Sequence, residues 1–409
     1  MGSIENVYVL SRSDNSQAID TIEFRNGDLK FDRAQPKIAK IGRVNSFPDQ
    51  IIELVNLKEL YCEHSCRIES LPPSLGQLKN LEKLTLKLER IVGLPEELGN
   101  LVNLKELSLI LCCKIEVLPP SIGRLKKLEI IFLENMWMLR KLPEEIGGLL
   151  NLKKLTLGQD HVVESLRGSI GKLKKLEKVD LTLKKSFELP EEFGELTNLR
   201  ELTLKSESYR IEALPRPIGR LKNLEILNLG GYVGEFSEAV LQDIGNWFPS
   251  KLKTLKIDRF RCMPSSHEHI RKLKGLMTLH MYGFTPREEL KDFLIKSIRS
   301  CPKLGAIELD WICRFDEEVT RRIESMLAFN RARFRIKNVQ AKLWPRLLAN
   351  PKLLYSRYAG AQRLCSFGDN PYAHVMREEV VYRILVDNCE FLSILISRLP
   401  KRQKLNPGL

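Results

Sequence analysis

The chain has 409 residues, of which 43% are hydrophobic and 29% charged, a composition typical of folded, soluble proteins rather than disordered ones. Its formal net charge of +14 favours acidic partners, which could be nucleic acid, an anionic membrane or an acidic protein. Aromatic residues account for only 7%, whereas nucleic-acid modules stack bases on aromatic side chains, so we expect no specific nucleic-acid partner.

The ends and cysteines of the chain bear on its location. Residues 1–6 have neither a basic start nor an apolar run, so we expect no export signal. No stretch approaches 18 consecutive apolar residues, so we expect no membrane span. The nine cysteines are an odd number, and we interpret them as reduced thiols in a cytoplasmic protein. Cys62 and Cys66 have the spacing of half a zinc site, but no second ligand pair follows.

Residues 1–40 are predicted to form an N-terminal β cap. Asn26-Gly27 lies between alternating polar and apolar residues in the segment 21–31, which is a strong signal for a β-hairpin. The hairpin would cover the exposed edge of the segment that follows.

From residue 41 to about 310 the chain is built from repeats, which are 23 to 25 residues long between Gly76 and Gly219. The segment 71–86, Leu-Pro-Pro-Ser-Leu-Gly-Gln-Leu-Lys-Asn-Leu-Glu-Lys-Leu-Thr-Leu, shows the pattern. A period of 20–29 residues with L-x-x-L-x-L predicts a solenoid of about 11 stacked units, none of which buries its apolar face alone. The array is marked by the recurring glycines Gly76, Gly99, Gly123, Gly147, Gly171, Gly194 and Gly219.

Each repeat is predicted to contain one strand and one short helical turn. Positions one, four and six of L-x-x-L-x-L, for example Leu81, Leu84 and Leu86, should face the core, and the residues between them should face outward. The turn opens at a proline in most repeats, although Arg167 replaces it in the fifth. The strands are expected to start at Leu57, Leu81, Leu104, Leu128, Leu152, Leu176, Leu199, Leu224, Leu252, Leu276 and Leu304.

The array becomes irregular after Leu229. Longer spacings there predict outer helices at residues 239–247 and 287–300. Residues 311–409 are predicted to form a C-terminal helical domain or cap. One amphipathic helix is expected at 317–335 and a strongly apolar one at 376–399, which must be buried. We favour packing within the tail or on the last repeat, and keep a dimer or partner interface as the alternative.

No motif for catalysis stands out. The P-loop pattern is absent, as are the lysine strand, catalytic loop and D-F-G of kinases. His267 and His269 lack a third metal ligand, so we expect no metal and no cofactor. A ubiquitin-ligase-like tail is the enzymatic alternative, with Cys313, Cys365 or Cys389 as the thiol, but none has an adjoining acidic motif.

The residues L-P-x-x-[LI]-G-x-L-x-N-L-x-x-L-x-L, at 71–86, 94–109 and 142–157, resemble the cytosolic leucine-rich repeats of plants and algae. The pattern is similar to plant intracellular Ras-group-related repeat proteins, and 111–119 resembles the sensor repeats of disease-resistance receptors. The tail around 343–347 and 377–383 faintly resembles helical extensions of diatom repeat proteins. The resemblance implies an α/β horseshoe with a parallel sheet on its concave face, acting as a scaffold or adaptor in signalling. The asparagine ladder that such repeats carry after the strand is mostly missing, so some turn backbone groups need other partners.

The predicted function is therefore non-enzymatic binding of a protein on the outward strand face of the middle repeats. Ile110, Ile130 and Phe132 are apolar where solvent is expected, which favours a contact site. The alternatives are an acidic polymer held by the basic surface and the enzymatic tail described above. The predicted partner-binding residues are Glu106, Ser108, Ile110, Ile130, Phe132, Glu134, Lys154 and Thr156, with the region of Thr278, His280 and Tyr282 as the second choice.

Overall fold

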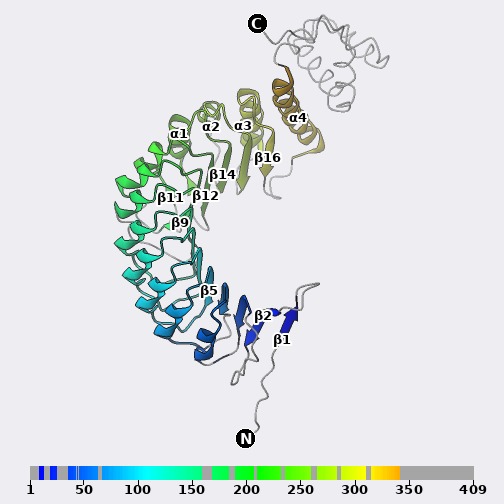
Figure 1. Ribbon diagram of the computed structural model, residues 1–409. Helices are drawn as coiled ribbons and strands as arrows, with labels where there is room; N and C mark the ends of the chain where they lie inside the picture. The colour runs from blue at the N-terminus through cyan, green and yellow to red at the C-terminus, as the bar shows by residue number, and fades with distance from the viewer. Residues whose placement is uncertain are drawn as a thin grey trace, which may run out of the picture. The chain divides into compact units, whose positions relative to one another are not determined.

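The computed structural model divides into two compact units, residues 1–261 and 262–409, which we describe separately (Figure 1). The border between the units lies within the repeat region. The structure describes residues 9–12, 19–24, 36–42, 44, 46–62, 67–158, 168–183, 189–206, 210–231, 235–258, 265–282, 287–309 and 315–340.

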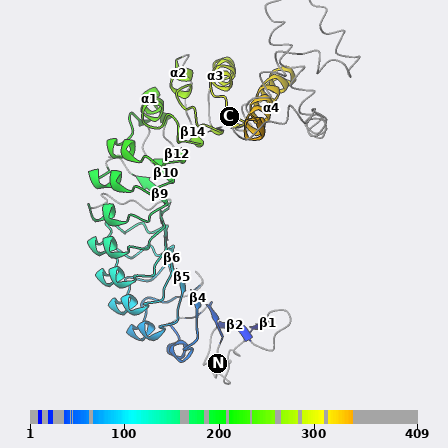
Figure 2. The same cartoon turned by 45° about the horizontal axis from the view of Figure 1, so that its top comes forward.

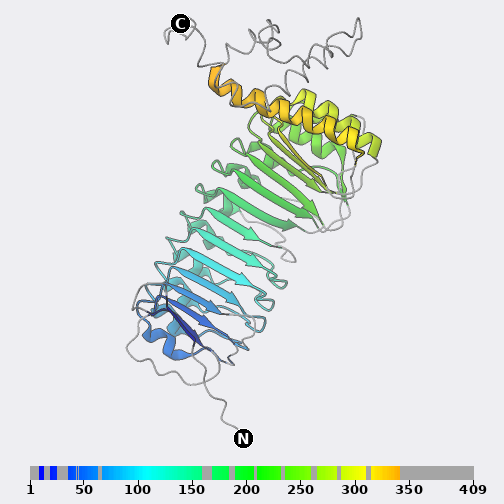
Figure 3. The same ribbon diagram turned by 90° about the vertical axis from the view of Figure 1, so that its right-hand side faces the viewer.

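The first unit is one open sheet with short helices on one side (Figures 1 and 2). All its described neighbouring strands are parallel except β1 and β2, and they follow chain order along the sheet, as Figure 3 shows. The strands are β1 (Val9–Arg12), β2 (Ile19–Phe24), β3 (Ile38–Ile41), β4 (Glu59–Cys62), β5 (Lys83–Lys87), β6 (Glu106–Ile110), β7 (Ile130–Glu134), β8 (Lys154–Leu157), β9 (Lys178–Leu183), β10 (Glu201–Ser206), β12 (Ile226–Gly231) and β14 (Thr254–Asp258).

Short 3-10 helices alternate with these strands. A separate two-stranded pair joins β11 (Arg210–Ile211) and β13 (Glu235–Phe236), and the α-helix α1 (Glu238–Trp247) replaces the 3-10 helix in the last repeat of the unit. The 3-10 helices are η1 (Asp49–Glu53), η2 (Pro73–Gln77), η3 (Glu96–Asn100), η4 (Pro120–Arg124), η5 (Glu144–Gly148), η6 (Gly168–Lys172), η7 (Glu191–Glu195) and η8 (Arg216–Arg220).

The repeat leucines form the core, as predicted. Leu81, Leu84 and Leu86 are fully buried, and the equivalent residues of the other described repeats of this unit are also buried. The predicted strand starts are two residues early, because the first leucine of the motif belongs to the preceding turn. The Leu81 amide donates to the Leu78 carbonyl at 3.0 Å, and β5 begins only at Lys83.

The glycine that ends each L-P-x-x-L-G motif is required for stacking. A Cβ built on Gly99 would lie 2.4 Å from the carbonyl oxygen of Ser121 in the next repeat. The same distance is 2.5 Å from Gly76 to Glu97 and from Gly123 to Glu145. The sequence left open whether this glycine serves close approach or a positive φ, and the structure shows close approach. The helical turns also form without proline, since η6 begins after Arg167.

Side chains satisfy the turn backbone in two ways. Asn80 Nδ2 donates to the Val55 carbonyl and Asn103 Nδ2 to the Lys79 carbonyl, both at 2.8 Å. Asn151, Asn198 and Asn223 make the equivalent bond, so an asparagine ladder precedes several of the strands. After the strand, where asparagine was predicted to be missing, the sulfur of Cys112 lies 3.6 Å from the Leu86 carbonyl of the previous repeat. The ladder therefore runs along the other end of the strands.

Alternating charges precede successive strands. Glu82 accepts hydrogen bonds from Lys105 at 2.6 Å and from Lys58 at 3.0 Å, which lowers its pKa from 4.5 to about 2. The same arrangement joins Lys153 to Glu129 at 2.8 Å and Lys253 to Glu225 at 2.7 Å.

We expect Glu82→Gln to lower the free energy of unfolding by less than about 1 kcal/mol at neutral pH, because the ion pairs are solvent-screened. The folded pKa lies below the ordinary value, so the contribution is present above about pH 4.5 and is lost as the pH falls towards about 2. Urea unfolding of the original chain and of the Glu82→Gln variant, at several pH values between neutral and about 2, measures this contribution. The difference should shrink at acid pH, and Glu89→Gln, at a residue with no ion pair among the described residues, should show no such trend.

At the N-terminus, β1 and β2 form the antiparallel pair, with Leu10 opposite Ile22. β2 pairs on its other edge with β3 in parallel, with Ile22 opposite Ala39. Both edges of β2 are thus occupied, by β1 and β3. The turn predicted at Asn26-Gly27 and its second arm, residues 28–31, lie outside the described residues.

The second unit contains α2 (Ser266–Ile270), β15 (Thr278–Tyr282), α3 (Arg287–Ser300), β16 (Ala306–Leu309) and α4 (Glu317–Gln340). The outer helices predicted at 239–247 and 287–300 are confirmed by α1 and α3, and the helix predicted at 317–335 by α4. Ile323 and Leu327 of α4 are buried, as its amphipathic pattern predicted. The helix expected at 376–399 lies outside the described residues.

Asn330 of α4 satisfies the backbone beneath it. Its buried amide donates to the carbonyls of Ile298, Cys301 and Leu304 at 3.2, 3.2 and 2.9 Å. We expect Asn330→Ala to cost about 1–3 kcal/mol, because these acceptors would lose a buried donor. Hydrogen exchange in α3 and β16 measures the loss. The exposed neighbour Glu324→Ala is the control, and equal protection in both variants would show that Asn330 does not hold α4 in place.

Candidate protein-binding surface

We call the side of the first unit's sheet that lies opposite the 3-10 helices the outward strand face. Strand alternation places the eight predicted residues on it in register. Ser108, Phe132 and Thr156 are paired across β6, β7 and β8. The flanking positions align Glu106 with Ile130 and Lys154, and Ile110 with Glu134.

Three of the eight residues form an apolar centre. Ile130 and Phe132 alternate with the buried Ile131 and Leu133 on β7, and both are partly exposed. Ile110 is opposite Glu134, so it is a diagonal neighbour of Phe132, within reach of an aromatic side chain. The structure thus brings the three apolar side chains onto one area of the face.

The other predicted residues differ in exposure. Lys154 is exposed, while Glu106, Glu134 and Thr156 are partly exposed. Ser108 was expected to face solvent, but it is only 6% exposed. It is a small side chain paired directly with the larger Phe132, which accounts for its being covered. Ser108 therefore supplies little contact area of its own.

On one side of this centre lies an ordered polar group on β4–β6. Lys83 Nζ binds Glu106 at 2.8 Å and lies 5.8 Å from the centre of the Tyr61 ring, a cation–π distance. The Tyr61 hydroxyl donates to Glu59 at 2.6 Å. Burial, followed by this hydrogen bond to Glu59, raises the pKa of Tyr61 well above its usual range, so it stays a neutral donor.

On the other side, β8–β10 carry a second polar group. Lys178 Nζ binds Glu201 at 2.6 Å and lies 3.8 Å from Asp180, which accepts a hydrogen bond from Thr156 at 3.3 Å. Partial burial acts to lower the pKa of Lys178, but the Glu201 hydrogen bond and the charge of Asp180 outweigh it, and the pKa is raised. The second carboxylate oxygen of Asp180, Oδ1, is buried and has no hydrogen-bond partner among the residues that the structure describes.

The site prediction missed Tyr61, Lys83, Lys178, Asp180 and Glu201. They occupy the same outward positions of L-x-x-L-x-L, so extending the alternation to neighbouring repeats would have found them. It also missed an exposed pair in the loop after β7, Trp137 and Met138, which are 59% and 41% exposed. The sequence does indicate this pair, because Trp and Met stand at positions where the two preceding repeats have Glu89-Arg90 and Cys113-Lys114.

The second-choice region lies in the second unit, on β15 and β16. His280 Nδ1 is 2.6 Å from a carboxylate oxygen of Glu308, and the Tyr282 hydroxyl donates to the same oxygen at 3.2 Å. His280 is only 6% exposed. These side chains hold each other in place, but no apolar group comparable to Ile110, Ile130 and Phe132 accompanies them on the described strands.

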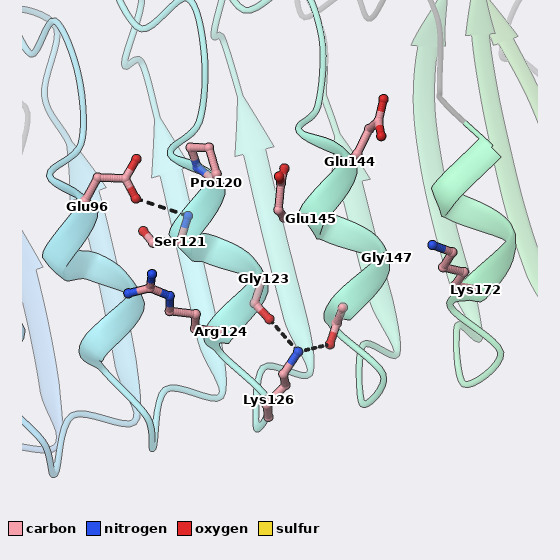
Figure 4. A pocket seen from close by; sticks show the side chains of 11 residues that line it. Glu96, Pro120, Ser121, Gly123, Arg124, Lys126, Glu144, Glu145, Gly147 and Lys172 are labelled. Atoms are coloured by element: carbon pink, nitrogen blue, oxygen red, sulfur yellow. Dashed lines mark hydrogen bonds between the residues drawn. The ribbon is translucent and has the colours of Figure 1, made fainter.

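A hollow of about 580 Å³ lies on the opposite side, among the 3-10 helices η3–η6 (Figure 4). Glu96 accepts a hydrogen bond from the Ser121 amide at 3.2 Å, and Lys126 Nζ binds the carbonyls of Gly123 and Gly148. These lining groups are engaged in holding adjacent repeats together, and the lining mixes both signs of charge. The hollow therefore reflects how the helical turns stack.

The described thiols are suited to packing and not to catalysis. Cys62, Cys112 and Cys301 are buried, and burial raises the pKa of Cys112 and of Cys301 to about 11. Cys66 and the tail residues Cys313, Cys365 and Cys389 lie outside the described residues. Within the described ranges, no three His, Cys, Asp or Glu side chains are grouped to hold a metal ion. No helix there has both the length and the apolar character to cross a membrane.

A protein-family model supports the repeats predicted from the sequence. Residues 110–265 match a family model described as a leucine-rich repeat region. The solved structure of a leucine-rich repeat protein from Leptospira interrogans is similar with 23% identity and a TM-score of 0.41, covering 67% of this chain and 78% of that chain. No curated protein matches the chain. Residues 110–265 are thus a leucine-rich repeat region, and the fold of this chain is a leucine-rich repeat solenoid.

Proposed function

We propose that the chain is a non-enzymatic adaptor that binds a protein partner on the outward strand face of the first unit. The observation that carries the proposal is the apolar centre of Ile110, Ile130 and Phe132, with an ordered polar group on each side. Protein interfaces commonly combine a central apolar or aromatic anchor with a polar rim. Ion pairs that already fix the rim side chains reduce the ordering cost of binding.

The dimensions of the face favour a protein over a small ligand. The polar groups begin at β4 and end at β10, so six strand spacings of about 4.8 Å give a surface roughly 30 Å long. Small-molecule sites are concave and enclose most of the ligand. The candidate surface instead spreads over exposed and partly exposed side chains of seven strands.

The resemblance to plant cytosolic repeat proteins supports a cytoplasmic signalling role as part of this proposal. Two other functions remain as outcomes of its test. One is an enzyme acting through the tail, and the other is an acidic polymer held by the net charge of +14. A polymer would bind without sequence preference and would be released by modest salt, because such binding depends on displaced counterions.

Capture of a partner by the full-length chain, followed by titration against outward-face variants, tests the proposal. Tyr61→Ala and Lys178→Ala should each weaken binding, whereas Glu144→Ala and Glu191→Ala on the 3-10 helices should not. Binding that survives every outward-face change but disappears without residues 311–409 would place the function in the tail. Binding of unrelated nucleic acids with steep salt dependence would favour the polymer.

A further inference from the structure

A second surface lies along one edge of the first unit, where the 3-10 helices turn into the strands. Each helix there ends at a buried leucine, such as Leu101 or Leu125, with φ near −75° and ψ near +65°, the geometry of an inverse γ-turn. A β-turn follows, in which for example the Leu104 amide donates to the Leu101 carbonyl at 2.9 Å, so the residue after the leucine is a central residue of that turn and lies at its tip. Successive tips, which we call the turn edge, are Val55, Lys79, Val102, Lys126, Leu150 and Lys174.

Apolar and basic residues alternate strictly along this turn edge. Val55, Val102 and Leu150 are 59%, 50% and 58% exposed, and they are among the most exposed large hydrophobic residues of the described chain. Each lysine between them is also exposed. With repeats spaced by about 4.8 Å, the apolar side chains recur at roughly 10 Å along the edge.

Backbone capping explains the lysines but not the apolar residues. Lys79 Nζ donates to the Asn100 carbonyl at 3.0 Å, Lys126 to Gly148 at 2.9 Å and Lys174 to Glu195 at 3.1 Å. Each lysine thus caps the C-terminal end of the 3-10 helix in the next repeat. The tip residue of that next repeat therefore does not have to be a lysine. The capping arrangement does not require the tip residue to be apolar. Thr197, for example, is polar and occupies the same position in a later repeat.

Basic residues outnumber acidic ones around the middle of the turn edge. Residues 124–127 contain Arg124, Lys126 and Lys127, and residues 172–175 contain Lys172, Lys174 and Lys175. Most acidic residues of the 3-10 helices lie in the first turn, at the opposite end, as in Glu96-Glu97 and Glu144-Glu145. Glu53 and Glu195 are exceptions at the last position of η1 and η7, and Glu195 forms an ion pair with Lys174 at 2.8 Å. The turn edge is therefore a basic strip with regularly spaced aliphatic tips.

We propose that this turn edge docks on the surface of an anionic lipid bilayer. Lysine ammonium groups at a lipid surface bind phosphate and carboxylate headgroups, and aliphatic side chains enter the headgroup boundary. A soluble polyanion would use the lysines but leave Val102 and Leu150 in water. A protein hot spot would need a contiguous apolar anchor, whereas lysines separate these side chains. Of these three partners, only a bilayer surface would contact both the lysine and the aliphatic side chains of the turn edge.

Co-sedimentation of the full-length chain with vesicles tests the proposal. We expect binding to phosphatidylcholine vesicles that contain phosphatidylserine, and little binding to phosphatidylcholine alone. The pair Val102→Ser and Leu150→Ser should lower the partition coefficient at least threefold, because aliphatic groups leave the interface. Replacing Lys126 and Lys174 by glutamine should lower it by about fivefold per residue, equivalent to about 1 kcal/mol each.

Matched variants on the opposite edge provide the control. Val92 and Val117 are 63% and 56% exposed in the loops after β5 and β6, so Val92→Ser with Val117→Ser removes similar apolar area elsewhere. The double variant Lys126→Arg with Lys174→Arg should bind as well as the original chain. Arginine keeps the positive charge, so this variant shows whether the glutamine variants lose binding through charge or through loss of the helix caps. Equal effects of the two serine pairs, heparin binding that matches vesicle binding in all variants, or no binding to anionic vesicles would each overturn the proposal.

Discussion

Gly99→Ala is expected to destabilise the first unit by about 3 kcal/mol, more than any other single change considered for this chain. The new methyl group would lie 2.4 Å from the Ser121 carbonyl oxygen and 2.7 Å from its Cβ. Both atoms belong to η4 in the next repeat, so relief requires that η3 and η4 move apart. That movement would disturb the buried contacts of Leu98 and Ile122, which are both fully buried.

Chemical denaturation and hydrogen exchange measure this effect together. Because each repeat of a solenoid touches only its neighbours, protection should fall most in the repeats that contain η3 and η4. Gly93→Ala is the matched control, since nothing lies within 4 Å of a Cβ built there, and it should be neutral or slightly stabilising. A Gly99→Ala protein as stable as the Gly93→Ala protein would show that the repeats do not depend on this close approach.

Phe132→Ala is expected to weaken partner binding by about 1–3 kcal/mol, a loss of roughly fivefold to more than 100-fold. Phe132 is the only aromatic residue of the apolar centre and stands between Ser108 and Thr156, which are too small to replace its contact area. Its side chain lies on the outward face and is only partly buried, so the free energy of unfolding should change little.

Isothermal titration of the captured partner against both proteins measures the loss. Val117→Ala removes an exposed apolar side chain from the loop edge and should leave affinity unchanged. If Phe132→Ala binds as tightly as the original chain, the contact site lies elsewhere, and His280 and Tyr282 become the next positions to change.

The repeat architecture could be predicted from the sequence because its signals are local and periodic. Leu84 and Leu86 are buried, as are their equivalents in the other repeats of the first unit, and Pro95 precedes η3 as its position predicts. The antiparallel partner of β2 could not be predicted in this way. A local turn preference could not reveal that Val9–Arg12, upstream in the chain, already occupies the antiparallel edge of β2.

The candidate site was predicted only in outline. Outward positions follow from strand alternation, but the exposure of each depends on residues one repeat away. Ser108 is covered because Phe132 stands opposite it, and Asp180 is positioned by Thr156 and Lys178. Such pairings require the register between strands, and a sequence gives that register only once the repeat lengths are aligned.

Site-specific photo-crosslinking in the full-length chain tests most directly whether the outward strand face holds the partner. A benzophenone amino acid would be placed in turn at positions 132 and 61 on that face, at 117 on the loop edge and at 144 on η5. We predict crosslinks to one partner from positions 132 and 61, abolished by excess unlabelled chain, and none from 117 or 144. Crosslinks to that partner from position 144 or 117, with none from 132, would contradict the assignment.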